Sequence, residues 1–348
     1  MSNKMTEYQI QFKENIKKLV NQNRLAEAKE LITQYEGIVQ DDIDLYSIKG
    51  VIAMMEGDLD RAEKILDKGI LKDSHEDLLY NIAYLYKMMG KVGRAIYFYK
   101  RLYHQTNDVK VKGETERELQ NLNADTRLRI LIGSPIHQNP RILREFLLSL
   151  KALNRKNLKI SYYFVDDNID EESSKIIREF AKVNNSVIVE RSGHRDQYIR
   201  NDNTHIWKEH LIWKVANFKN NIINYARDNN FDYLFLVDSD LILHPNTLQH
   251  LLSTRQEIIS EIFWTKWKQD SIKLPQVWMQ DVYTQHEISR GERLNAEEVN
   301  RRHMEFLNKL KKPGVYEVGG LGACTLISKY AMDKGVDFSE IKNLSFAG

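Results

Sequence analysis

From about residue 129 the chain alternates short apolar runs with longer amphipathic stretches, and this alternation restricts the fold more than any other feature of the sequence. The short runs suit buried strands and occupy residues 129–133, 160–165, 186–189 and 233–237. Helix-like stretches separate them at residues 141–153, 171–183 and 207–228. Strands that alternate with helices favour a mostly parallel sheet. We therefore predict an α/β fold for this part of the chain.

The first third of the chain has a different pattern, a repeat of helix-like segments. All five prolines lie beyond residue 134, so the strongest helix breaker is missing from this part. Two sets of residues recur at spacings of 34 and 33: Asn23, Gly57 and Gly90, and Ala28, Ala62 and Ala95. We expect the glycines to form turns between helices, because glycine accepts the left-handed backbone that ends a helix. The small alanines would let the paired helices pack closely.

A period of about 34 residues is typical of tetratricopeptide repeats, although an ordinary helical bundle would also fit. We predict an all-α helical-repeat domain at residues 1–110, a linker or last helix at 111–126, and the α/β domain at 127–348. The repeat region has no cluster of catalytic side chains. Its expected role is docking of a protein partner or self-association.

Composition limits the compartment and the partners. The 51 basic residues nearly balance the 49 acidic ones, which argues against nucleic acid as a partner. The single cysteine, Cys324, excludes an intrachain disulfide and fits a reducing compartment. The polar N-terminus lacks the apolar core of a signal peptide, and no apolar run approaches the ~20 residues that span a bilayer. We expect a cytoplasmic protein, with peripheral membrane attachment left open.

Three polar clusters follow strand-like runs, at residues 134–138, 166–170 and 238–240. Ligands of open α/β sheets bind beyond the carboxyl ends of the strands. Carboxylates gathered there repel one another unless a cation or hydrogen-bond donors lie between them. The clusters therefore predict a binding site for a charged ligand at one edge of the sheet.

The order of these motifs resembles a family 2 glycosyltransferase of the GT-A fold. The resemblance covers about residues 127–348 and rests on Val-Asp-Asp-Asn-x-Asp at 165–170 and Phe-Leu-Val-Asp-Ser-Asp at 235–240. It implies a nucleoside-diphosphate sugar as donor. It also implies that Asp166 or Asp167 binds the nucleoside, with Pro135 and Ile136 lining its pocket.

The Asp-x-Asp pair of that family holds a divalent ion. By this match Asp238 contacts ribose or the metal hydration shell, and Asp240 is the main ligand of Mn²⁺ or Mg²⁺. Charge builds on the diphosphate as its bond to the sugar breaks, and a hard cation held by oxygen ligands stabilises that charge. Taken alone, Asp-x-Asp is more often a solvated turn than a metal site, and the two acidic clusters in this order give the interpretation its strength.

Lys219 lies on the helix-like stretch before the Asp-x-Asp strand. Lys219 and Asn220 resemble an Arg-Asn pair that faces the donor in many family members. A lysine there could reach a diphosphate as a point charge, although a solvated helix surface is an equally good interpretation.

The acceptor side is less defined. Tryptophans at 264, 267 and 278 suit sugar stacking or simple packing, and residues 319–324 resemble a glycine-containing strand near the acceptor site of the family. Cys324 in that segment is expected to be a small buried residue. The family's catalytic base is usually in a Glu-Asp pair beyond this strand, and no such pair precedes Gly348.

We therefore expect the α/β domain to be incomplete at its C-terminus, either truncated or a natural fragment, and impaired in transfer. Asp281 is our first choice of base within the chain, ahead of Asp270 and Glu317.

Other functions remain open at this stage. The chain could be a transferase-like scaffold that acts through its helical repeats. A sugar nucleotidyltransferase would need a basic, glycine-rich loop after the first strand, which is missing here. The acceptor could be a protein, a peptide or a glycan, and neither the donor sugar nor its nucleotide is defined.

Overall fold

The computed structural model describes residues 2–194, 196, 198–200, 205–206, 208–266, 272–279, 284–289 and 291–339. The chain divides into two compact units, Met1–Arg127 and Leu128–Gly348. Each unit has its own hydrophobic core and is described by itself.

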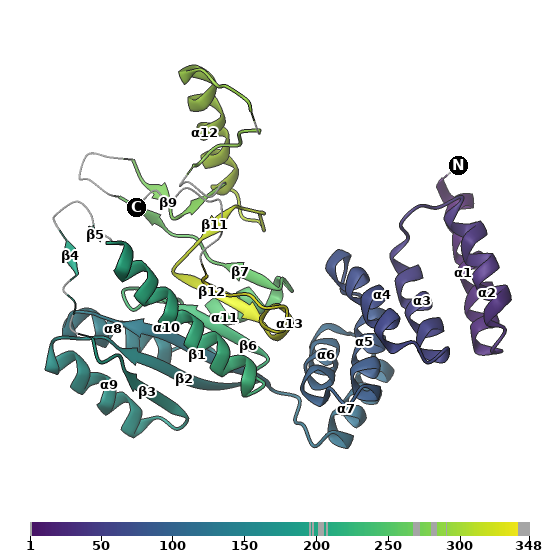
Figure 1. Cartoon of the computed structure of the whole chain (residues 1–348), viewed down its shortest axis with the longest axis horizontal. Helices are drawn as coiled ribbons and strands as arrows, with labels where there is room; N and C mark the ends of the chain where they lie inside the picture. Colours follow the sequence, from purple (N-terminus) through teal and green to yellow (C-terminus); the bar gives the residue numbers. More distant parts are fainter. Residues whose placement is uncertain are drawn as a thin grey trace. The chain divides into compact units, whose positions relative to one another are not determined.

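The described part of the first unit contains seven helices (Figure 1). They are α1 (Ser2–Asn21), α2 (Leu25–Glu36), α3 (Ile43–Met55), α4 (Leu59–Lys72), α5 (Glu76–Met88), α6 (Val92–Gln105) and α7 (Val109–Asn121). Helices α1 and α2, α3 and α4, and α5 and α6 pack as pairs, and α3 also contacts α5. Contacts with both the next helix and the one after it are typical of stacked helical repeats. Their assignment to tetratricopeptide repeats stays a prediction.

The turns between the paired helices have the left-handed backbone that the sequence predicts. Asn23, Gly57 and Gly90 have φ angles of 58°, 79° and 71°, in the left-handed region. The three equivalent alanines of the second helices are fully buried: Ala28, Ala62 and Ala95. The spacing read from the sequence therefore corresponds to a real structural period.

The second unit is built on a six-stranded sheet with the order β3-β2-β1-β6-β12-β7. Its strands are β1 (Leu128–Ile136), β2 (Leu158–Asp166), β3 (Val187–Arg191), β6 (Tyr233–Val237), β7 (Ile258–Ser260) and β12 (Cys324–Ser328). Strands β3, β2, β1 and β6 pair in parallel, while β12 runs antiparallel between β6 and β7. The prediction of an α/β fold with a mostly parallel sheet, preceded by a helical region, is confirmed.

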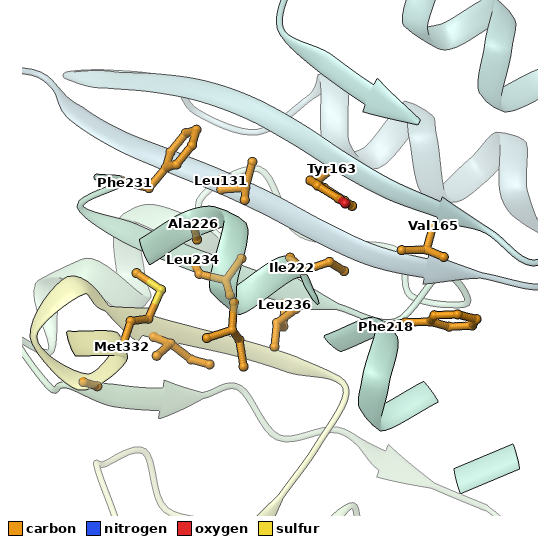
Figure 2. Close-up of a cluster of buried hydrophobic side chains, with 13 residues drawn as sticks. Leu131, Tyr163, Val165, Phe218, Ile222, Ala226, Phe231, Leu234, Leu236 and Met332 are labelled. Carbon is orange, nitrogen blue, oxygen red and sulfur yellow. The ribbon is translucent and has the colours of Figure 1, made fainter. Parts of the chain in front are cut away.

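Helices cover both faces of this sheet, as the alternation along β2 shows. Tyr163 belongs to a buried cluster in which α10 (Glu209–Asp228) and α13 (Lys329–Asp333) pack against β1, β2 and β6 (Figure 2). The neighbouring Tyr162 and Phe164 face the other way, with ring centroids 5.2 and 5.7 Å from that of Phe180 on α9 (Glu171–Val183). Helix α8 (Pro140–Lys151) packs against α9. The unit thus has a helix–sheet–helix arrangement.

Smaller elements complete the described part of this unit. They are three short antiparallel pairs and two helices, α11 (Thr247–Ser253) before β7 and α12 (Ala296–Leu310) between β7 and β12. One pair precedes α10, and the other two lie between β7 and β12. The pairs are β4 (Ile199–Arg200) with β5 (His205–Ile206), β8 (Trp264–Thr265) with β9 (Leu274–Pro275), and β10 (Val277–Trp278) with β11 (Gly320–Leu321).

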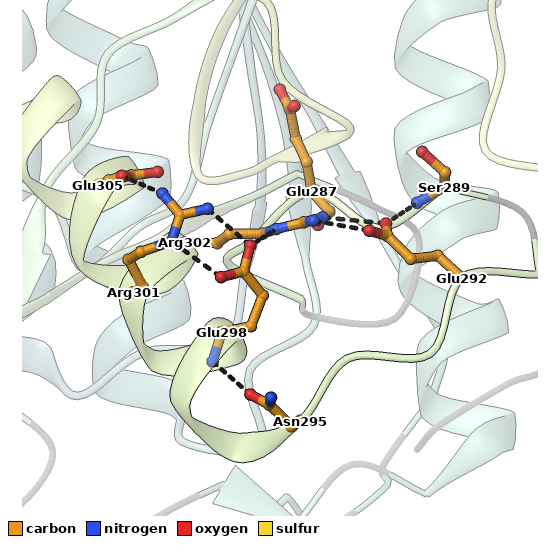
Figure 3. Close-up of polar contacts among 8 residues, drawn as sticks. All are labelled: Glu287, Ser289, Glu292, Asn295, Glu298, Arg301, Arg302 and Glu305. Atoms are coloured by element: carbon orange, nitrogen blue, oxygen red, sulfur yellow. Dashed lines mark hydrogen bonds and ion pairs between the residues drawn. The ribbon is translucent and has the colours of Figure 1, made fainter.

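Arginines on α12 hold the segment that leads into this helix (Figure 3). Arg302 donates to the carboxylates of Glu292 at 2.6 Å and Glu298 at 2.8 Å, and to the carbonyl oxygen of Glu287 at 2.9 Å. Hydrogen bonds from Arg301 and Arg302 lower the pKa of Glu298 to about 2.

Candidate functional site

A cavity of about 620 Å³ lies at the carboxyl ends of β1, β2 and β6, and we call it the edge cavity. Parallel pairing aligns these ends, since Ile136 of β1 pairs with Asp166 of β2 and Gly133 pairs with Leu236 of β6. Helix α10 and the segment after β3 complete the lining. Six of the residues singled out in the sequence line this cavity: Pro135, Ile136, Asp167, Lys219, Asp238 and Asp240.

Asp166 is not among the lining residues. It is 3% exposed, and its Oδ1 accepts hydrogen bonds from the backbone N–H and the Nδ2 of Asn168 at 3.2 and 2.8 Å. The hydroxyl of Ser174 donates to the same oxygen at 3.0 Å. Asp166 therefore ties the loop after β2 to the start of α9, while its neighbour faces the cavity.

Asp167 is surrounded by donors from the chain itself. Its Oδ1 accepts from the Ser192 hydroxyl at 2.6 Å, and its Oδ2 accepts from the Tyr198 hydroxyl at 2.7 Å. The Nζ of Lys214 on α10 lies 2.8 Å from Oδ2 and 2.9 Å from a carboxylate oxygen of Asp196. Asp167 is thus held rigidly at the cavity wall.

Lys214 is 92% buried, with 8% of its side chain exposed. Burial alone would lower its pKa, but hydrogen bonds to Asp167, Asp196 and Tyr198 outweigh this and raise the pKa above its usual value. Burial and the hydrogen bond to Asp167 likewise raise the pKa of Tyr198. The lysine therefore stays charged, and it fixes the position of both Asp167 and the tyrosine.

His137 and Tyr198 form an aromatic part of the cavity wall. Their ring centroids are 4.3 Å apart, with an interplanar angle of 47°. The Nδ1 of His137 donates to the carbonyl oxygen of Asp167 at 2.6 Å, since a carbonyl can only accept. Ring faces at a cavity wall suit a flat ligand such as a nucleobase.

Asp238 and Asp240 follow β6 and lie on the wall formed by its end. The Nζ of Lys219 is 3.4 Å from Oδ1 of Asp238, and Asp240 is exposed. Mg²⁺ is commonly held by one or two carboxylates together with phosphate oxygens of a ligand, so this pair of aspartates fits such an ion. No group of three or more His, Cys, Asp or Glu side chains that could hold a metal is found among the described residues.

The remaining candidates have other surroundings. Asp281, Asp270 and Trp267 lie outside the described residues. Glu317 is exposed and does not line the edge cavity. Asn220 accepts a hydrogen bond from the backbone N–H of Phe338 at 2.7 Å, which is a structural role.

Cys324 is 2% exposed at the start of β12, and burial raises the pKa of its thiol to about 12. A thiol with this pKa is protonated near neutral pH and is not a nucleophile. The interpretation of Cys324 as a small buried residue therefore agrees with the structure.

The tryptophan and glycine segments pack against each other. Trp264 packs on a small core of Val277, Phe306 and Leu310. An added Cβ at Gly320 would come 1.8 Å from Nε1 of Trp278. This glycine is therefore required by close packing of the indole.

Residues 128–273 match the family model described as the N-terminal domain of glycosyltransferase family 25. This part of the chain is a glycosyltransferase-like domain. All the residues that line the edge cavity lie within this range. None of the curated proteins compared with the chain matches it.

Two solved structures are similar to parts of the chain. One is the crystal structure of residues 1–349 of S. aureus TarS, with 17% identity and a TM-score of 0.28 over 47% of this chain and 42% of that one. The other is a mutant O-GlcNAc transferase of Thermobaculum terrenum, with 13% identity and a TM-score of 0.25 over 66% of this chain and 45% of that one. The chain thus spans less than half of either structure, and similarity at this level says nothing about substrates.

None of the described helices is both long and apolar enough to cross a bilayer.

Sequence reasoning missed three residues of the site. His137 stood within a noted polar cluster but was given no role, while Tyr198 and Lys214 showed no local signal. Lys214 lies five residues before Lys219 on the amphipathic helix α10, where a lysine is ordinarily expected on the exposed face. Only the fold brings its ammonium group to Asp167.

Proposed function

We propose that the α/β unit transfers a sugar from a nucleoside-diphosphate donor, bound in the edge cavity, to a hydroxyl acceptor with inversion at the anomeric carbon. The observation that carries this proposal is the composition of one cavity wall. The cavity at the ends of β1, β2 and β6 is lined by an aromatic pair (His137 and Tyr198), one lysine (Lys219) and two aspartates (Asp238 and Asp240). A volume of about 620 Å³ suits a ligand of nucleotide-sugar size.

In this proposal His137 and Tyr198 contact the nucleobase, and Asp167 keeps these rings in place. Asp238 and Asp240 hold Mn²⁺ or Mg²⁺, and Lys219 adds a positive charge near the diphosphate. A divalent cation, when bound, would stabilise the charge that develops on the diphosphate leaving group. The resemblance to family 2 transferases of the GT-A fold supports these roles, and so does the glycosyltransferase model matched by residues 128–273.

A thermal-shift panel tests donor binding directly. We expect one class of nucleotide sugar to raise the melting temperature in the presence of Mn²⁺ and to have little effect without it. The Asp240→Asn variant should fold normally and lose the Mn²⁺-dependent part of this shift. A shift of the same size in the variant would contradict the role of Asp240.

We propose that the helical unit serves a separate purpose, docking of a protein acceptor or self-association. Large apolar side chains are exposed on its repeats, among them Leu71 at 70%, Met88 at 47% and Val92 at 45%. A contiguous apolar patch on this unit would serve as such an interaction surface. The lone cysteine and the balanced charge fit a cytoplasmic setting. Light scattering of the purified chain decides whether it self-associates.

A further inference from the structure

A second cavity, of about 440 Å³, lies beside the edge cavity and is not used by the proposed donor site. Its lining begins at Leu241, directly after Asp240, the last residue of the edge cavity lining along the chain. The turn that follows β6 therefore borders both cavities. A ligand in the second cavity would therefore contact the turn that carries Asp238 and Asp240.

The second cavity contains one carboxylate, that of Glu261. Glu261 directly follows β7, and its backbone N–H donates to the carbonyl oxygen of Cys324 at 3.2 Å. On the other side of β12, the N–H of Asp238 donates to the carbonyl oxygen of Ala323 at 2.8 Å. Strands β6 and β7 run in the same direction, each antiparallel to β12, so both acidic residues lie at the same sheet edge.

This register fixes the separation of the two residues. Neighbouring strands are about 4.8 Å apart, and two such spacings place the backbones of Asp238 and Glu261 roughly 10 Å from each other. In an inverting transfer the base and the leaving diphosphate lie on opposite sides of the anomeric carbon. Strand β12 lies between the two residues, so a sugar ring that reached both carboxylates would lie across the end of this strand.

The side chain of Glu261 is oriented by a histidine. The Nδ1 of His250, on α11, lies 2.6 Å from Oε1 of Glu261, and the carboxylate accepts this hydrogen bond. Glu261 is 35% exposed, so its second oxygen can reach a ligand in the cavity. Asn246 and Thr247 add polar groups to the lining, and Phe263 adds a ring face. Polar groups around an aromatic face suit a sugar ring.

We propose that the second cavity binds a carbohydrate acceptor and that Glu261 is the base that deprotonates its hydroxyl, with His250 as a positioning residue. This inference rests on the proposed function. The acceptor oxygen forms a bond to the anomeric carbon as the bond from that carbon to the β-phosphate oxygen breaks. The hydroxyl proton moves to Glu261, and the nucleoside diphosphate leaves with the electron pair of the broken bond.

The test measures release of nucleoside diphosphate from the donor that wild type turns over, with water and simple p-nitrophenyl glycosides as acceptors. Glu261→Gln keeps the shape and the hydrogen bond from His250 but removes the base. We expect release to fall by about 100-fold or more, a typical loss for general-base catalysis. Affinity for the nucleoside diphosphate should stay within a factor of about two, since the donor site is untouched.

Two further variants separate catalysis from structure. Glu261→Ala should regain release when formate is added, because the small anion can take the place of the missing carboxylate. The matched control is Glu257→Gln. Glu257 directly precedes β7, whereas Glu261 directly follows it, and this variant should release nucleoside diphosphate at the wild-type rate. Wild-type release by Glu261→Gln, or loss in Glu261→Ala that formate does not rescue, would overturn the assignment.

A different experimental result would contradict the proposed function itself. If wild type releases no nucleoside diphosphate from any nucleotide sugar, the donor site itself is wrong and the base assignment falls with it. If Asp240→Asn abolishes release while Glu261→Gln does not, the donor site stands and only the assignment of Glu261 is overturned.

Discussion

Neighbouring carboxylates at the end of β2 have different surroundings and therefore different expected roles. Asp166 accepts two hydrogen bonds from the loop that follows the strand and one from the first turn of α9, whereas Asp167 lies at the edge cavity. The sequence named both without distinguishing them, because consecutive residues of a strand end have the same local pattern. Their distinction depends on Ser174 and Lys214, which belong to two different helices.

Replacing Asp166 by alanine should destabilise the α/β unit by about 1–3 kcal/mol, because three buried donors lose their acceptor. All five tryptophans lie beyond residue 128, so their fluorescence during urea unfolding reports on this unit alone. Asp228→Ala, at an exposed position, is the control and should have the wild-type midpoint. An unchanged midpoint for Asp166→Ala would show that the loop does not depend on this carboxylate.

Lys214 connects the wall of the edge cavity to α10, and its loss should affect nucleoside binding. We expect Lys214→Met to weaken binding of a nucleoside diphosphate by about ten-fold, or 1.4 kcal/mol, because Tyr198 and Asp167 lose their shared partner. Affinity for inorganic pyrophosphate should change little, since it lacks the nucleoside. Calorimetric titration measures both.

The control for this prediction is Lys175→Met, which removes an exposed lysine 3.9 Å from Glu179 on α9. Equal losses of affinity for pyrophosphate and for the nucleoside diphosphate would mean that Lys214 supports the whole fold rather than the nucleoside wall.

At the level of elements, the sequence was most informative in the part of the chain where strands and helices alternate at short intervals. Residues 233–237 were expected as a strand and form β6 with the same bounds, and residues 171–183 form α9 as expected. Strand β7 was not predicted, and β12 begins only at Cys324, the last residue of the segment 319–324 that resembles a glycine-containing strand. Strand β7 has only three residues, and its partner β12 follows about 65 residues later, so no local pattern marks the pairing.

The missed strand explains why Glu261 was missed as well. The candidates for a base named from the sequence were Asp281, Asp270 and Glu317, and Glu261 was not among them. A carboxylate can be assigned to the sheet edge only when the strand before it has been predicted. Asp167, Asp238 and Asp240 follow strands that the sequence predicts, so these carboxylates could be assigned to the edge from the sequence.

Glycines within the helical unit allow a matched test of its packing. A Cβ at Gly50 in α3 would lie 2.5 Å from Cδ2 and 2.6 Å from Cγ of Leu66 on α4, whereas a Cβ at Gly113 in α7 would meet no atom within 4 Å. Gly50→Ala should destabilise the helix pair by about 1–3 kcal/mol through overpacking. Gly113→Ala should instead stabilise α7 by roughly 0.5–1 kcal/mol, because alanine favours helix.

Hydrogen exchange of peptides from α3, α4 and α7 measures both effects as changes in the free energy of local opening. Faster exchange in Gly113→Ala, or unchanged exchange in Gly50→Ala, would contradict the packing described for these helices.

For the whole molecule, the division after Arg127 predicts that the two units can be separated. A fragment of residues 128–348 should keep the tryptophan fluorescence of the folded α/β unit and the donor hydrolysis of the full chain. Its use of a protein acceptor, or its self-association, should be weaker, because the exposed apolar repeats are removed. A fragment that kept its fold but lost donor hydrolysis would show that the helical unit contributes to the donor site.

The central claim is that the edge cavity cleaves a nucleotide sugar with the help of Asp240. Its most direct test is the release of nucleoside diphosphate from a panel of nucleotide sugars in the presence of Mn²⁺, with wild type and Asp240→Asn compared at equal folded concentration. We predict release from one class of donor by wild type, abolished by removal of Mn²⁺ and by Asp240→Asn. Release by Asp240→Asn at the wild-type rate under saturating Mn²⁺, or no release from any donor by wild type, would contradict the account.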